Sequence, residues 1–327
     1  MEKRALITGI TGQDGSYLSK LLLEKGYKVY GLMRRAVDRS MKNLEELGLV
    51  SSIEFLDGEL TDECSLIHAV KVSRPDEVYN LGAQSFVGTS WDNPIYTTEV
   101  NAFGPLKLLN ILRHLQPGAH FYQASTSEMF GNSHHNGLQT EETPFHPRSP
   151  YAISKLYAHW ITVNYRESYG MFACSGILFN HESPLRGKEF VTRKITDGIA
   201  RIKYGLADAL YLGNIDSKRD WGFAGDYVEA MWLMLQQKEP RDFLVSTGET
   251  HSVEEFIELA FSYAGIKDWR KYVKVDQRYM RPADVFALHG HSTKTKEILG
   301  WEPKVKFHEL VKLMVDADMK RVAKEKK

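Results

Sequence analysis

Short apolar runs alternate with stretches of helical periodicity along the first half of the chain. The runs are too short for helices and are rich in residues that favour buried strands; they cover 3–8, 28–33, 53–60, 77–84 and 120–125. Segments between them, such as 16–26 and 106–115, place apolar residues three and four apart, which is typical of amphipathic helices. Strands that alternate with helices predict a doubly wound α/β fold with a parallel sheet, whose ligands bind at the carboxyl ends of its strands.

A glycine-rich turn joins the first predicted strand to its helix. Gly9, Gly12 and Gly15 allow a tight bend and a close approach of the backbone to a pyrophosphate, and the helix that follows directs its positive end toward that anion. A strand, this turn, a helix and a second strand form the unit that dinucleotide sites require. The candidate cofactor contacts on the turn are Gly9, Thr11, Gly12, Gln13, Asp14 and Gly15.

The residues after the second predicted strand indicate which dinucleotide would bind. NAD sites usually place a carboxylate there for the ribose hydroxyls, whereas this chain has Arg34 and Arg35. Two guanidinium groups suit a 2′-phosphate, so the sequence predicts NADP rather than NAD. A solvated basic loop is the alternative interpretation.

The second half of the chain does not have the pattern of one continuous domain. The helix expected at 226–235 and the strand expected at 243–247 are apolar enough to return to the large sheet. We therefore expect a Rossmann-type cofactor domain at 1–180, with 217–247 returning to it, and a smaller, interleaved α/β substrate domain formed mainly by 181–327. The stretch from 304 onward ends in Lys-Glu-Lys-Lys, which is typical of a fraying, solvated terminus.

Composition excludes several classes of function. The 327 residues include 42 acidic and 42 basic side chains, a balance that predicts no binding to nucleic acid or to an anionic membrane. No stretch approaches the roughly 20 apolar residues that span a bilayer, and no export signal is recognisable, so we expect a cytoplasmic protein. Cys64 and Cys174 lack the spacing of a metal site, and the histidines lack supporting ligands; no metal is predicted.

Tyr151 and Lys155 are the candidate redox pair. Residues four apart share a face of a helix, so the Lys155 ammonium can lie near the Tyr151 phenol and favour its ionised form. This matters because a phenol with its usual pKa of about 10 is a poor base at neutral pH. Together with the glycine-rich turn, the pair predicts nicotinamide chemistry.

Six sequence blocks resemble the extended short-chain dehydrogenase/reductase family and, within it, the nucleotide-sugar dehydratases. The blocks lie at 9–18, 83–91, 122–131, 147–160, 180–187 and 218–232, so the resemblance covers essentially the whole chain. It implies NADP as cofactor, a GDP-sugar as substrate and a homodimer or homotetramer. The cofactor contacts that it adds to those on the turn are Glu59, Leu60, Leu81, Ala83, Ser85, Tyr151 and Lys155. Glu59 replaces the usual aspartate near the adenine, which keeps the acceptor on a longer arm.

The resemblance also implies a set of catalytic roles. Tyr151, with Lys155, takes the proton from the sugar O4 while the C4 hydride passes to NADP, and Thr126 hydrogen-bonds the same oxygen. Glu128 then removes the C5 proton and helps to expel the C6 hydroxyl as water, before the hydride returns to C6. For Thr126, a hydroxyl that merely caps the local turn is the alternative interpretation.

The expected substrate contacts combine cations with polar groups. An arginine fork suits phosphate oxygens, and Lys194, Arg219 and Arg281 lie in the segments that match the family best. The complete predicted set is Ser85, Thr126, Asn180, Lys194, Arg219, Arg281 and Asp284. Asp284 stands where the family more often has glutamate, which bears on the identity of the sugar.

The reaction implied by the resemblance is the 4,6-dehydration of GDP-mannose. Three other possibilities stay open: the same chemistry on a GDP-heptose, an added reduction of the 4-keto product, and a catalytically silent NADP-binding regulator. The intact set of Thr126, Glu128, Tyr151 and Lys155 argues against the silent regulator.

Overall fold

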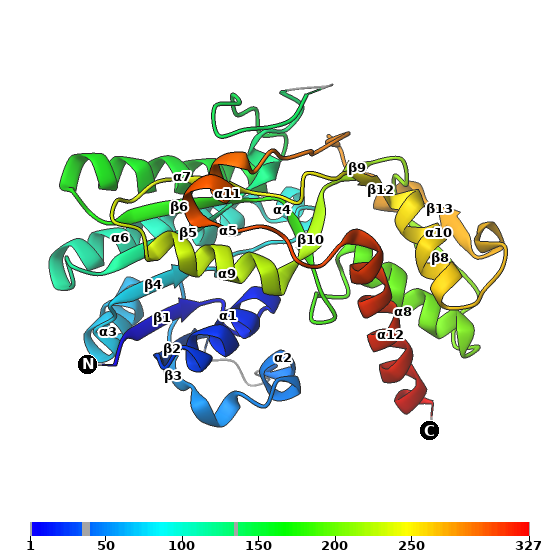
Figure 1. Cartoon of the computed structure of the whole chain (residues 1–327), viewed down its shortest axis with the longest axis horizontal. Helices are drawn as coiled ribbons and strands as arrows, with labels where there is room; N and C mark the ends of the chain where they lie inside the picture. The colour runs from blue at the N-terminus through cyan, green and yellow to red at the C-terminus, as the bar shows by residue number, and fades with distance from the viewer. Residues whose placement is uncertain (1, 35–39, 134–136, 327) are drawn as a thin grey trace.

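A parallel sheet of seven strands forms the larger part of the molecule (Figure 1). The computed structural model describes residues 2–34, 40–133 and 137–326, and within these the strand order is β11-β6-β5-β4-β1-β2-β3. The strands are β1 (Arg4–Thr8), β2 (Lys28–Met33), β3 (Glu54–Asp57), β4 (Glu77–Asn80), β5 (His120–Thr126), β6 (Ala173–Leu178) and β11 (Phe243–Val245). All neighbours pair in parallel, so the predicted doubly wound α/β fold is confirmed.

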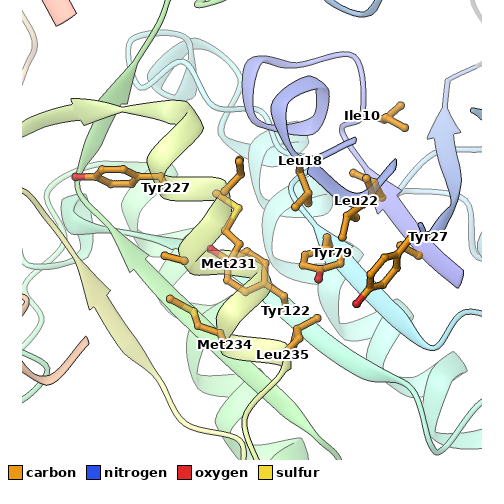
Figure 2. Packing of buried hydrophobic residues seen from close by; sticks show 14 of the residues in the cluster. Ile10, Leu18, Leu22, Tyr27, Tyr79, Tyr122, Tyr227, Met231, Met234 and Leu235 are labelled. Carbon is orange, nitrogen blue, oxygen red and sulfur yellow. The ribbon is translucent and has the colours of Figure 1, made fainter. Parts of the chain in front are cut away.

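Helices cover both faces of this sheet. On one face, α1 (Gln13–Glu24) packs beside α9 (Ala224–Leu235), and Figure 2 shows Leu18, Leu22, Met231 and Met234 gathered near Tyr79 and Tyr122 of the sheet. α11 (Thr293–Leu299) also packs on this part, against α9 and β11. The other face carries α3 (Glu63–Ser73), α6 (Gly104–Leu115) and α7 (Pro150–Tyr169), whose apolar side chains form a second core.

The smaller part has its own core at the opposite end of the molecule from α3 and α6 (Figure 1). Its helices are α8 (Val191–Lys203), α10 (Val253–Tyr263) and α12 (Phe307–Glu325). Three short strand pairs accompany them: β8 (Leu210–Leu212) with β13 (Val273–Val275), β9 (Lys218–Arg219) with β12 (His251–Ser252), and β10 (Trp221–Phe223) with β7 (Asn180–Glu182). The stretch after 304 was predicted to be a solvated terminus; this is wrong, because α12 buries Leu310, Val311, Met314 and Val315 against α8 and α10.

The chain passes between the two parts repeatedly. It enters the smaller part after β6, returns through β10 to α9, leaves again after β11, returns to α11, and finally reaches α12. Shorter helices, α2 (Lys42–Glu46), α4 (Thr89–Asp92) and α5 (Pro94–Thr98), lie in the loops of the larger part. Across the described ranges, none of the helices is both long and apolar enough to cross a bilayer.

Candidate active site

A cleft of about 650 Å³ opens where the carboxyl ends of the large sheet face the smaller part. Ligands of doubly wound sheets bind at this edge, because the loops that leave the strands converge there. The cleft brings together most of the residues singled out in the sequence: Asp14, Leu81, Ala83, Ser85, Thr126, Glu128, Tyr151, Lys155, Asn180, Lys194, Arg219, Arg281 and Asp284.

Thr126 and Glu128 are placed by the end of β5. The strand ends at Thr126, and a 3-10 turn (Ser127–Met129) directly follows. The Thr126 hydroxyl oxygen accepts a hydrogen bond from the Glu128 backbone N–H at 3.2 Å, so it does cap the turn. The same side chain is hydrogen-bonded to the Tyr151 phenol. Thr126 therefore links the carboxylate-bearing turn to the tyrosine, and all three side chains are buried.

Tyr151 and Lys155 project from the first turns of α7. Pro150 occupies the first turn of the helix and the Ser149 hydroxyl oxygen accepts from the Ala152 N–H at 3.1 Å, which fixes where the helix starts. Lys155 Nζ donates to the Ala124 carbonyl at 2.9 Å, and burial lowers the pKa of Lys155 to about 8.

The predicted lowering of the tyrosine pKa by Lys155 is wrong for the chain by itself. Burial raises the pKa of Tyr151 to about 12, and the opposing effect is the hydrogen bond from Thr126 rather than the lysine. The physical reason is that burial disfavours charge on both side chains, while Lys155 is held by a backbone carbonyl.

The glycine-rich turn is shaped for close backbone packing. Gly9 has φ of +69°, and a Cβ atom there would lie 2.8 Å from the backbone of Gly82. A Cβ on Gly15 would lie 2.5 Å from the Gly9 carbonyl oxygen. Gly12 begins α1 without a side-chain cap, so the first-turn N–H groups of the helix suit an anion such as a pyrophosphate. These residues, with Thr11, fit the predicted dinucleotide.

Gln13 and Asp14 connect this turn to β7 and the loop after it. Gln13 Oε1 accepts from the Ser183 hydroxyl at 2.7 Å, and Gln13 Nε2 donates to Asp14 at 3.0 Å. Asp14 Oδ2 lies 2.8 Å from His181 Nε2. Burial would raise the pKa of Asp14, but the His181 imidazole outweighs burial and keeps that pKa below its usual value. Asp14 and His181 both line the cleft, whereas Gln13 does not.

A second cavity of about 630 Å³ lies between the end of β3 and α5. Its lining residues are Glu59, Thr61, Asp92, Asn93, Pro94, Ile95, Tyr96 and Glu99. Arg34 Nη1 donates to the Tyr96 hydroxyl at 3.0 Å, which places the guanidinium of Arg34 beside the cavity that Tyr96 and Glu59 both line. Leu60 is buried and packs near Gly82 and Gly104. The other arginine of the predicted pair, Arg35, lies outside the described residues.

Two guanidinium groups approach Glu128 from the smaller part. Arg281 Nη1 lies 3.7 Å from Glu128 Oε1. Arg219 is buried, and burial lowers its pKa, although the charge of Glu128 opposes that shift. Arg219 Nη1 donates to the Lys218 carbonyl at 2.8 Å, and its Nη2 is 3.8 Å from Asp284. The cleft therefore holds a carboxylate and two cations at its centre.

Asp284 and Lys194 are both engaged with neighbouring side chains. Asp284 Oδ2 accepts from Asn214 Nδ2 at 3.0 Å and from the Ser217 hydroxyl at 3.1 Å, so its carboxylate also organises a turn of the cleft wall. Lys194 Nζ lies 3.4 Å from the centre of the Tyr279 ring, and burial lowers the pKa of Lys194.

Sequence reasoning missed three residues that shape these cavities. His181 lines the cleft together with Arg186 and lies within the family-like block 180–187, which could have pointed to it. Tyr96 lines the second cavity, but an aromatic residue on a short helix gives no signal.

Asn101 lies in a π-helix (Glu99–Phe103), a rare element that often marks functional sites. Asn101 Oδ1 accepts from Gln84 N–H at 2.8 Å and its Nδ2 donates to the Ser154 hydroxyl at 3.2 Å, which joins the loop after β4 to α7.

The fold, the glycine-rich turn and the tyrosine-lysine pair at the sheet edge define a Rossmann-type enzyme of the extended short-chain dehydrogenase/reductase class. The family model described as GDP-mannose 4,6 dehydratase matches residues 6–314. The chain therefore belongs to the GDP-mannose 4,6-dehydratase family.

Individual relatives agree with this assignment. GDP-mannose 4,6 dehydratase 2 of Arabidopsis thaliana is 54% identical over 99% of this chain and 89% of its own length. Among solved structures, dTDP-glucose 4,6-dehydratase of Bacillus anthracis in complex with NAD has a TM-score of 0.86 at 22% identity, covering 98% of both chains. RMD of Pseudomonas aeruginosa in complex with NADPH has a TM-score of 0.80 at 24% identity, covering 98% of this chain and 100% of that one. At these identities the two structures show the shared fold.

Proposed function

We propose that the protein converts GDP-D-mannose to GDP-4-keto-6-deoxy-D-mannose by internal hydride transfer from C4 to C6 with loss of water. The observation that carries this proposal is the group formed by Thr126, Glu128 and Tyr151 in one buried part of the cleft. An oxidoreductase that works at C4 needs the tyrosine, whereas removal of water also needs a second acid-base group. Relatives that carry the dehydratase name favour this activity over a GDP-heptose dehydratase and over a silent regulator.

Tyr151 and Glu128 move protons, and Thr126 orients the sugar through a hydrogen bond. Tyr151 takes the proton from the sugar O4, and the Thr126 hydroxyl hydrogen-bonds the same oxygen. A bound, oxidised nicotinamide would supply the hydride acceptor and donor, and its positive charge would favour ionisation of the buried phenol. Glu128 removes the C5 proton, which the C4 ketone has made acidic, and then, as the protonated acid, gives a proton to the departing C6 hydroxyl so that water leaves.

We propose NADP as the cofactor. Its pyrophosphate would lie at the turn from Gly9 to Gly15, where the first-turn N–H groups of α1 suit an anion. Leu81, Ala83, Ser85 and Lys155 line the part of the cleft that the nicotinamide end would reach. Arg34, beside the second cavity, is the described cation that suits a 2′-phosphate.

The nucleotide-sugar would bind across the rest of the cleft. Arg219, Arg281 and Lys194 supply positive charge for the diphosphate. Asn180 Oδ1 is buried and has no hydrogen-bond partner among the described residues, so it is available to a hydroxyl of the sugar or its phosphate. Arg281 and Asp284 lie on the segment that also carries Tyr279 over the cleft.

A homo-oligomer is part of the proposal. Ile153, Tyr157 and Trp160 follow each other at helical spacing on α7, and Ile95 on α5 adds to their exposed apolar surface; Ile95 is 76% and Trp160 55% exposed. Contiguous apolar surface of this kind is typical of interfaces, and a second copy of the chain is the occupant we propose. Sedimentation of a monomer alone at micromolar concentration would contradict it.

The activity is tested with a panel of GDP-sugars and mass spectrometry of the products. GDP-mannose should lose water, and in deuterated water the product should gain solvent hydrogen at C5 while the hydrogen that reaches C6 comes from C4 of the same sugar. Glu128→Gln should lower turnover by at least about a hundredfold while GDP-mannose still binds, because general acid-base catalysis is worth that much. Undiminished turnover in Glu128→Gln, or solvent deuterium delivered to C6 as the hydride, would overturn the assignment.

A further inference from the structure

Asp220 is a fully buried carboxylate without a role in the proposed chemistry. It lies between β9, which carries Arg219, and β10, at a point where the chain passes from the smaller part back to the larger one, and its exposed fraction is 0%. Charged side chains are seldom buried without a compensating set of partners, so those partners indicate what the carboxylate does.

Four donors from two distant segments converge on this carboxylate. Its Oδ1 accepts from the Thr247 N–H at 2.8 Å and from the Thr247 hydroxyl at 2.7 Å. Its Oδ2 accepts from the Gly248 N–H at 3.0 Å, and the backbone of Gly290 also donates to the group. The Asp220 carboxylate thus connects the loop after β11 and the segment before α11 to the junction of β9 and β10.

These contacts enclose the backbone that carries Arg219. On one side, β12 pairs with β9, so that His251 lies opposite Arg219. On the other side, the Lys218 N–H donates to the Phe286 carbonyl at 2.9 Å, and the Asp220 N–H donates to the Leu288 carbonyl at 3.1 Å. The two segments that flank β9 are joined in sequence to the residues that donate to Asp220. Residues 247–248 lead into β12, and residues 286–288 lead to Gly290.

We propose that Asp220 is a positioning residue for the substrate diphosphate: it fixes the strand from which Arg219 enters the cleft. The inference rests on the proposed function, because it takes Arg219 as a phosphate ligand. Asp220 itself does not line the cleft, whereas Arg219 does, so Asp220 acts through the arginine. A bidentate arginine contact depends on the placement of its backbone, since the guanidinium fork is rigid.

An amide cannot replace this carboxylate. An asparagine would keep one acceptor oxygen for Thr247, but its NH₂ group would face the N–H groups of Gly248 and Gly290 and leave them without an acceptor. In the enzyme loaded with NADP, Asp220→Asn should therefore weaken GDP binding and raise the KM for GDP-mannose by roughly tenfold to a hundredfold. The kcat at saturating substrate and the affinity for NADPH should stay within about twofold of wild type.

Acid provides a second readout in the unmodified protein. Burial raises the pKa of Asp220 to about 6 against the effect of its hydrogen bonds. Protonation removes acceptor capacity, so the KM for GDP-mannose should rise as the pH falls through about 6, and this rise should be absent in Asp220→Asn. The other titratable or charged groups nearby are Lys218 and Arg219 on β9, His251 on β12, Tyr227 on α9, Glu249 and His289. His289 contacts the Gly248 carbonyl through Nε2 at 2.8 Å, so His289→Gln should retain the rise in KM if Asp220 causes it.

A set of matched variants separates the possible outcomes. Thr247→Val removes one donor to Asp220 and should raise the KM severalfold, which covers the case in which Asp220→Asn does not fold. Asp208→Asn, at an exposed aspartate of the same part, should match wild type.

If Arg219→Ala leaves GDP affinity unchanged, the proposed phosphate contact itself is wrong. If Arg219→Ala weakens GDP but Asp220→Asn and Thr247→Val bind it like wild type, the positioning role is overturned. Equal losses in kcat, NADPH affinity and GDP affinity would also overturn it, since they would indicate general destabilisation.

Discussion

A single glycine decides where Glu128 lies. Gly131 has φ of +54°, and a Cβ atom there would lie 1.9 Å from the His146 carbonyl oxygen. Its N–H donates to the Glu128 carbonyl at 3.2 Å, and the His146 N–H donates to the Met129 carbonyl at 2.9 Å. The turn after Glu128 therefore packs against the backbone at His146, and only glycine fits there.

Gly131→Ala should displace this turn. We expect turnover of GDP-mannose to fall at least about tenfold and the free energy of unfolding to fall by about 2 kcal/mol, from the combined strain of the positive φ and the contact with His146. Gly118→Ala is the control, because its Cβ would meet nothing within 4 Å. Steady-state assays and denaturant unfolding measure both effects, and a Gly131→Ala enzyme with normal turnover would show that the position of the turn is unimportant.

Arg34 is the residue of the described chain on which we expect cofactor choice to depend. Its guanidinium is held by the Tyr96 hydroxyl at 3.0 Å beside the second cavity. Arg34→Ala should weaken NADP binding by about tenfold or more and change NAD binding little, because only NADP has the 2′-phosphate. Calorimetric titration with both dinucleotides tests this, with the distant surface variant Arg241→Ala as control. Equal losses for NAD and NADP would contradict the assignment.

At the scale of elements, the buried ion pair between Asp318 and Arg193 holds α12 against α8. Asp318 is 0% exposed and accepts from Arg193 Nε at 2.8 and 2.7 Å and from the Thr196 hydroxyl at 2.6 Å. Arg193 Nη1 in turn donates to the carbonyls of Pro184 and Arg186, so the last helix supports the loop that follows β7. Lys194, the next residue along α8, turns into the cleft.

Removing this carboxylate should destabilise the fold strongly. Asp318→Ala leaves the Arg193 charge buried and unpaired, so the free energy of unfolding should fall by about 3 kcal/mol or more. Asp316→Ala on the same helix removes a solvent-exposed pair with Lys312 and should change stability little. Urea unfolding of both variants gives the comparison; similar small losses would mean that the buried pair contributes no more than the exposed one.

At the scale of the whole molecule, the sequence predicts the elements that depend on local periodicity. It predicts few of the side-chain contacts between residues that are far apart in the chain. The strands, the parallel sheet and the cleft at its carboxyl edge follow from runs such as 77–84 and 120–125, because apolar period and turn chemistry are local properties. The contact between Arg193 and Asp318 spans 125 positions, and no local pattern distinguishes a buried cation from an exposed one. Lys155 shows the same limit: its spacing from Tyr151 is visible in the sequence, but its bond to Ala124 is not.

The ion pair between Asp14 and His181 connects the cofactor turn to the strand that begins the smaller part, across 167 positions. Burial would lower the pKa of His181, but Asp14 and the Phe179 carbonyl raise it above its usual value of about 6.5. The contribution of His181 to stability is then complete below that value and is lost as the pH rises through the folded pKa. For Asp14 the folded pKa is lowered, so its contribution is complete above about 3.9 and is lost as the pH falls.

The stability that this pair adds should therefore be greatest between about pH 4 and pH 6.5. Measured as the difference in unfolding free energy between wild type and His181→Gln across pH 3 to 9, it should form a plateau in that window and shrink on both sides. His120→Gln, at a partly buried histidine that contacts the Leu235 carbonyl rather than a carboxylate, serves as the control. A difference that does not vary with pH would show that the His181 contact is not ionic.

The repeated passage of the chain between its two parts has a consequence for synthesis on the ribosome. α8 and α10 leave the exit tunnel well before α12, yet their apolar faces, which include Ile199 and Phe256, are covered by that last helix. The nascent chain must therefore carry two uncovered apolar faces until α12 has left the tunnel. Strands β1 to β6 are complete much earlier, so this segment has time to fold, and under the proposed function a dinucleotide bound at that stage would stabilise it while the smaller part is still being made.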